Sequence, residues 1–196
     1  FAARFLSVYD YGSLQTLISL QNIALIPIVI LATLLTRIIA EHNKNNFQEK
    51  SLALRMNLRR WFFFPGILLL PLFFFLTPIL KSFFNIDSNW PFILLWVSLY
   101  LAIFQSIDSS LLNGWHKFFE SNLSSVSNGM SKFFSVVFFM ALGWGLVGGF
   151  LGIVMGSLAH MAVNIYFVST KFFEKRNFLE KGEKHLYIER EKMISA

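Results

Sequence analysis

The amino-acid sequence predicts an all-α protein, a polytopic bundle of transmembrane helices. Hydrophobic residues make up 55% of its 196 residues and charged residues only 14%, whereas soluble domains carry about 25% charged residues. The apolar residues gather in runs without a charge, long enough to cross the ~30 Å hydrocarbon core of a bilayer. The 24 phenylalanines would promote aggregation in water but suit a lipid environment. We therefore expect an integral membrane protein.

The expected bundle occupies residues 1–170 and contains five membrane spans, and residues 171–196 form a basic tail. The spans are residues 14–36, 61–80, 88–112, 123–142 and 146–167. Each is close to the ~20 apolar residues that a transmembrane helix needs.

Residues 1–13 are expected to form a turn that leads into the first span, because Asp10 and Gly12 favour turns and helix starts. The span at residues 14–36 contains Pro27, which predicts a kink. Its polar residues share one face, which is a candidate cavity wall: Gln15, Ser19, Asn22 and Thr33.

Residues 37–60 are rich in basic residues and asparagine, and predict a solvent loop followed by an amphipathic segment on the membrane surface. The second span contains three prolines, and residues 81–87 read as a short polar turn. Trp90 and Pro91 open the third span, as an interfacial anchor and a helix start.

Residues 121–170 carry a single charge, Lys132. A helix of this length would measure ~75 Å, more than twice the hydrocarbon thickness, so the segment must fold back. Glycines cluster around Trp144, at Gly143, Gly145, Gly148 and Gly149, and glycine is a strong breaker. These residues predict a helical hairpin.

Polar residues follow one face of the first hairpin helix: Ser121, Ser125, Asn128, Lys132 and Ser135. A lysine within a span costs ~2.5–3.5 kcal/mol even on insertion scales. We therefore expect Lys132 to look into a bundle interior or a hydrated cavity, with pairing to Asp108 or snorkelling toward the interface as the alternatives.

On the second hairpin helix every fourth residue is small or polar, in the order Gly148, Gly152, Gly156, His160 and Asn164. Small residues let another helix approach closely, and polar ones can bond across the interface. This face predicts a helix-packing seam in which His160 and Asn164 form interhelical hydrogen bonds, with a transport role as the alternative.

All of the 17 lysines and arginines except Arg4, Lys81 and Lys132 fall on one side of this topology. By the positive-inside rule that side, which includes the tail, is cytoplasmic. This placement accounts for the net charge of +6 without a nucleic-acid partner.

The sequence offers little for catalysis, and we expect no cofactor. There is no cysteine, and the four histidines lack a metal-ligand spacing. Residues 143–148 match G-x-G-x-x-G, but no strand precedes them. Asp108 is the one carboxylate within a predicted span, so paired acids for an enzyme are not indicated.

Several short motifs resemble those of the polysaccharide flippases, members of the multidrug/oligosaccharidyl-lipid/polysaccharide exporter superfamily. Residues 3–12, ARFLSVYDYG, are similar to the family's AR-x-L-x-x-x-(D/E)-(Y/F)-G motif and include Arg4, Asp10, Tyr11 and Gly12. Residues 36–41 resemble the basic end of the family's second helix, 111–118 its L-x-G-x-x-(K/R)-F turn, and 143–149 its Gly-rich turn. The resemblance covers essentially the whole chain.

The resemblance implies helices two to six of the N-terminal lobe of a two-lobed transporter in the bacterial cytoplasmic membrane. Such a transporter moves a polyprenyl-diphosphate-linked oligosaccharide by alternating access around a cationic cavity. It implies as partners the membrane lipid, the lipid-linked glycan and a second lobe. Export of a drug or a peptidoglycan precursor, or a membrane enzyme of glycan assembly, are the alternatives.

The residues expected to line the cavity are Lys132, Asn128, Gln105, Asn22 and Arg37. Arg37 is alternatively a positive-inside anchor. Asp108 is a candidate for a coupling ion or, alternatively, for an interfacial cap or an ion pair. The motif at residues 3–12 is expected to shape the outer loop rather than to touch substrate.

Overall fold

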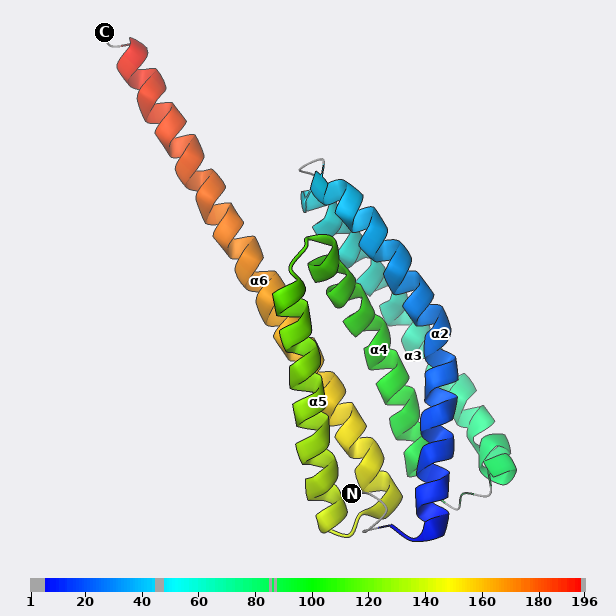
Figure 1. Ribbon diagram of the computed structural model, residues 1–196. Helices are drawn as coiled ribbons and strands as arrows, with labels where there is room; N and C mark the ends of the chain where they lie inside the picture. Colours follow the sequence, from blue (N-terminus) through cyan, green and yellow to red (C-terminus); the bar gives the residue numbers. More distant parts are fainter. Residues whose placement is uncertain (1–5, 45–47, 85, 87, 195–196) are drawn as a thin grey trace. The chain divides into compact units, whose positions relative to one another are not determined.

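The computed structural model describes residues 6–44, 48–84, 86 and 88–194, and of these it leaves out the side chains of 48, 65, 68–74 and 171–194. The described residues form helices and no strand (Figure 1). The helices are α2 (Val8–Lys44), α3 (Gln48–Phe84), α4 (Trp90–Gly114), α5 (Phe118–Ala141) and α6 (Gly145–Ile194). The all-α class is therefore confirmed. The chain divides into two compact units, Phe1–Asn164 and Ile165–Ala196, and the candidate site lies in the first.

The start of α2 is fixed by a reciprocal cap between Ser7 and Asp10. The Asp10 backbone N–H donates to Ser7 Oγ at 3.0 Å, and the Ser7 hydroxyl donates to Asp10 Oδ2 at 2.7 Å. This arrangement satisfies a free N–H of the first turn and places a carboxylate at the positive end of the helix dipole. Asp10 thus leads into a helix, although the helix begins earlier than the predicted span.

The prediction of a solvent loop from residue 37 is wrong. α2 continues to Lys44, and α3 begins at Gln48 and runs unbroken into the apolar segment after Arg60. Many of the polar residues at these ends are arginine, lysine, glutamate or glutamine, which are good helix formers, and Arg37 pairs with Glu41 one turn later, at 3.6 Å. Both helices therefore extend beyond their apolar segments.

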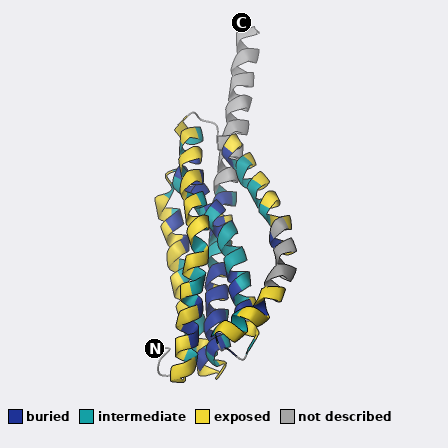
Figure 2. Cartoon of the chain, turned by 90° about the vertical axis from the view of Figure 1, so that its right-hand side faces the viewer, coloured by how far each residue is buried: buried dark blue, intermediate teal, exposed yellow. Residues whose placement is uncertain are grey.

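α4 is the central helix of the bundle, and it begins at Trp90 with a proline in its first turn, as predicted. Its side chains Phe92, Leu95, Ile107, Leu111 and Leu112 are at most 1% exposed. Buried residues line the inward sides of the helices (Figure 2). The other helices therefore pack around α4.

The chain breaks between α5 and α6 at the predicted glycines. Gly143 and Gly145 have φ of +81° and +49°, values that glycine adopts without steric cost. After the turn the two helices pack closely, because a Cβ at Gly148 would lie 3.0 Å from Phe139 and one at Gly152 would lie 2.7 Å from the Val136 backbone nitrogen.

α2, α4 and α6 run in the same direction within the first unit. One apolar cluster joins their early turns, with Leu14 and Leu17 from α2, Phe92 and Leu95 from α4, and Phe150 and Ile153 from α6. Farther along, Gly114 of α4 lies against Ile39 of α2. α3 and α5 are the return segments between them.

Three helical segments among the described residues are long and apolar enough to cross a membrane, Val8–Lys44, Trp90–Gly114 and Gly145–Thr170. They indicate a membrane protein, although five spans were predicted. α5 is long enough to cross a membrane, but its serines, asparagines and lysine make it less apolar than these three segments. Part of the predicted span at residues 61–80 lies outside the described side chains, and the apolar part described there, Phe75–Phe84, is shorter than a span.

Candidate functional site

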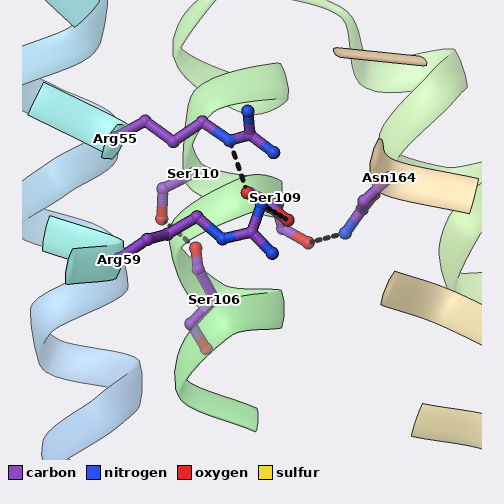
Figure 3. A network of polar contacts seen from close by, with 7 residues as sticks. Arg55, Arg59, Ser106, Ser109, Ser110 and Asn164 are labelled. Atoms are coloured by element: carbon purple, nitrogen blue, oxygen red, sulfur yellow. Dashed lines mark hydrogen bonds and ion pairs between the residues drawn. The ribbon is translucent and has the colours of Figure 1, made fainter. Parts of the chain in front are cut away.

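The candidate site is centred on Asp108, whose side chain is fully buried on α4. Arg55 Nε lies 2.6 Å from Asp108 Oδ1, and Arg59 Nη1 lies 3.7 Å from Oδ2 (Figure 3). Arg55 and Arg59 are four residues apart on α3, so they share a helix face. Asp108 therefore forms an ion pair, one of the alternatives expected for it, but its partners are arginines of α3 and not Lys132, the partner that the sequence offered as one alternative.

The two arginines hold the carboxylate unequally. Arg55 is 14% exposed and forms a short charge-assisted hydrogen bond. Arg59 is 24% exposed and too far from Oδ2 for a hydrogen bond, and its guanidinium also lies over the Phe104 ring, 5.6 Å from the centroid. Two cations face one carboxylate, so the cluster carries one positive charge in excess.

A neutral polar network lies beside this cluster and joins three helices. Ser109 Oγ of α4 lies 3.2 Å from His160 Nε2 and accepts a hydrogen bond from Asn164 Nδ2 at 3.0 Å, both from α6. Asn128 Nδ2 of α5 lies 3.4 Å from His160 Nδ1. If the Asn128 amide donates to Nδ1, the ring hydrogen is on Nε2 and points at Ser109, which describes a neutral imidazole.

Further polar contacts radiate from the same stretch of α4. Gln105 Nε2 donates to the Ser157 carbonyl of α6 at 2.9 Å. Ser110 Oγ lies 2.9 Å from the Ala32 carbonyl of α2 and 2.6 Å from the Ser106 carbonyl. Since successive helical residues point ~100° apart, the six residues 105–110 reach α2, α3 and α6 at once.

The structure does not bring the expected cavity residues together. Gln105 is buried and Asn128 half-buried in the helix contacts described above, whereas Lys132 and Asn22 are exposed. Arg37 is also exposed and pairs with Glu41.

The expectation that Lys132 looks into the interior of this bundle is not met. A Cβ at Gly156 of α6 would lie 2.8 Å from Lys132 Cβ, so the lysine stem lies along the α5–α6 seam. The Lys132 side chain is nevertheless exposed, although Ser121, three turns earlier on the same side of α5, is buried.

The other predicted residues separate into packing and loop positions. Gly148, Gly152 and Gly156 are buried against α5. Tyr11 and Gly12 are exposed in the first turns of α2, and Arg4 lies outside the described residues.

Sequence reasoning did not assign Arg55, Arg59 or Ser109 to the site. Two features of the sequence could have indicated them. Arg55 and Arg59 are four residues apart just before one apolar run, and Ser109 belongs to a mostly polar stretch, residues 105–110, within the next apolar run. The contact of Arg55 and Arg59 with Asp108 requires residues 48–60 to be part of the helix α3, whereas the sequence predicted a loop and a surface segment there.

Within the part of the chain that the structure describes, no group of three or more His, Cys, Asp or Glu side chains could hold a metal ion. No protein-family model, curated protein or solved structure matches the chain.

Proposed function

We propose that the chain is part of the N-terminal lobe of a two-lobed flippase, which moves a polyprenyl-diphosphate-linked oligosaccharide across the bacterial cytoplasmic membrane by alternating access. The motif resemblance supports this proposal. The observation that carries it is that α2 and α5 keep polar groups on exposed faces, Asn22 and above all Lys132.

An ammonium group in a membrane segment is costly against lipid, by ~2.5–3.5 kcal/mol on insertion scales, and such groups usually face protein or a hydrated path. Lys132 lies halfway along α5, two turns or more from either end. A second lobe facing α2 and α5 would enclose these polar faces in a hydrated path. Lys132 then supplies the positive charge that meets the substrate diphosphate.

The direction of the helices supports a five-span topology. α2, α4 and α6 are apolar enough to cross the membrane and run parallel, so the chain must return between them. The connection from α4 to α5 is only Trp115 to Lys117, and that from α5 to α6 only Leu142 to Trp144. α5 is thus the returning span despite its polar face, and α3 is the other, with the basic ends in the cytoplasm.

In this proposal the Asp108 cluster is an anchor rather than the transport site. Its short bond to Arg55 ties α3 to α4, while the Ser109 and His160 network ties α4 to α6. These contacts keep the lobe rigid during rocking of the two lobes.

Single-cysteine labelling tests the hydrated path directly, because the sequence contains no cysteine. In cells that make the protein carrying this chain, we expect Lys132→Cys to react with a membrane-impermeant, water-soluble thiol reagent. Phe134→Cys is the matched control on the same helix, at a side chain that is 62% exposed, and we expect it to stay unlabelled. Equal protection of both positions would mean that Lys132 faces lipid, and would contradict the proposal.

Complementation tests the substrate. The protein should restore glycan display in cells that lack an O-antigen flippase, and Lys132→Ala should abolish it while Lys117→Ala, at the α4–α5 connection, should not. Strains with different repeat units separate an oligosaccharide flippase from a drug or peptidoglycan-precursor exporter. Normal display by Lys132→Ala would remove this residue from the path.

A further inference from the structure

A recess of about 570 Å³ lies on the outer side of the Asp108 cluster, between α3 and α4. Its size falls within the ~300–1,000 Å³ of typical ligand sites. Phe63 and Phe64 of α3 line it on one side, and Tyr100, Leu101 and Phe104 of α4 on the other. The walls are therefore almost entirely apolar and aromatic.

The aromatic wall on α4 is held in place by contacts with α3. The Tyr100 ring packs directly on Gly66, where a Cβ would overlap it, and its hydroxyl donates to the Phe63 carbonyl at 3.3 Å. Tyr100 also meets Phe104 edge-to-face, with centroids 5.0 Å apart. Contacts between α3 and α4 therefore fix the position of the aromatic wall of the recess.

The charged residues that line the recess are both arginines, Arg59 and Arg60. Asp108 already has its short contact with Arg55, so the Arg59 charge is only partly compensated. Arg60 is exposed and also borders a second open recess of about 500 Å³, together with Trp61 and Phe64. The two arginines therefore give an excess of positive charge at one side of an apolar recess.

We propose that this recess binds one anionic phospholipid, with its phosphate at Arg59 and Arg60 and an acyl chain along the apolar walls that Phe64, Leu101 and Phe104 help to form. Guanidinium groups bind phosphate oxygens in a bidentate manner, and basic pockets between membrane helices hold anionic head groups. A free phosphate ion would meet the same two arginines but leave the apolar walls uncovered, and the two arginines repel a cationic ligand. The lipid is a resident of the lobe, so this inference does not depend on the transported substrate.

Native mass spectrometry of the whole chain, purified in mild detergent with phosphatidylglycerol or phosphatidylcholine, tests the proposal. We expect one phosphatidylglycerol to stay bound and phosphatidylcholine to be lost. Arg60→Gln should weaken this binding roughly tenfold, because it removes a charge-assisted contact. Arg37→Gln removes the same charge from an exposed site on α2 and should leave binding unchanged.

A second variant tests the acyl chain separately. Leu101→Trp fills the recess without changing charge, and we expect it to displace phosphatidylglycerol as Arg60→Gln does. Circular dichroism of each variant should show unchanged helix content. Equal retention of the two lipids, equal effects of Arg60→Gln and Arg37→Gln, or full retention by Leu101→Trp would each overturn the proposal.

Discussion

Asp108 shows how a buried charge constrains a helix bundle at the scale of single residues. Its carboxylate is 0% exposed and faces two guanidinium groups. Moving such groups out of water is costly, so the pair is stable only while both signs are present. Removing one partner should therefore lower the free energy of unfolding by more than the loss of one contact would, because it leaves the other charge buried without its counterion.

We expect Asp108→Asn to destabilise the protein by about 3 kcal/mol, the lower end of the range for breaking a buried pair, since Arg59 retains some solvent contact. Glu41→Gln is the control, because it breaks an exposed pair with Arg37 and should cost less than about 1 kcal/mol. Denaturant titration in detergent measures both. Similar losses for the two variants would contradict the buried pairing.

The two arginines should differ in the same experiment. Arg55→Gln removes the 2.6 Å bond and leaves Asp108 with a distant partner, whereas Arg59→Gln leaves that bond intact. We expect Arg55→Gln to cost at least about 1.5 kcal/mol more than Arg59→Gln, the lower end of the range for a hydrogen bond to a charged group. A larger loss for Arg59→Gln would reverse the proposed order of the partners.

At the scale of elements, glycine spacing decides how α5 and α6 meet. A Cβ at Gly152 would lie 2.7 and 2.9 Å from the backbone N and Cα of Val136. Backbone atoms have little freedom to move aside, so the two helices would have to separate. Gly129 on α5, in contrast, has nothing within 4 Å of the position of a Cβ.

The same substitution should therefore have opposite signs at these two glycines. Gly152→Ala should destabilise the protein by about 1–3 kcal/mol through overpacking. Gly129→Ala should stabilise it by up to about 1 kcal/mol, because alanine is the better helix former. Thermal unfolding followed by circular dichroism compares them, and destabilisation by both would show that the α5–α6 contact differs from the one described.

The elements also show which parts of the fold the sequence could predict. The α5–α6 turn was predictable because the chain there needs positive φ and glycines supply it. The start of α4 was predictable from Trp90 and Pro91. The extensions of α2 and α3 were not, because hydropathy marks where apolar residues end, whereas a helix continues as long as its polar residues favour it.

The candidate site was predictable only in part, for a related reason. A lone carboxylate in an apolar run identified Asp108, but its partners Arg55 and Arg59 belong to a distant segment whose helical register sets their direction. The polar stripe of α5 lies on one helix, as the spacing of its residues implies, but its residues range from buried Ser121 to exposed Lys132. How deeply each of its residues is buried depends on the packing of α5 against its neighbours, which the period of one helix does not specify.

At the scale of the whole molecule, the bundle has two ends that a membrane would separate. The start of α4 and the α5–α6 turn belong to one end, and the end of α2 and the α4–α5 connection to the other. If α3 and α5 both cross the membrane, cysteines placed at one end should all be accessible from the same side. If α5 did not cross, the chain could not return from the end of α4 to the start of α6, because the connections on either side of α5 are only three residues long.

Asn89→Cys and Trp144→Cys represent the first end, and Glu41→Cys and His116→Cys the second. In intact cells we expect an impermeant thiol reagent to label the first pair, and to reach the second pair only after the membrane is opened, since the positive-inside rule predicts that the basic end is cytoplasmic. Labelling of Trp144→Cys and His116→Cys from the same side would show that α5 does not cross. Labelling of the second pair alone would show the opposite orientation, and would contradict the proposed access of a diphosphate to Lys132 from the cytoplasm.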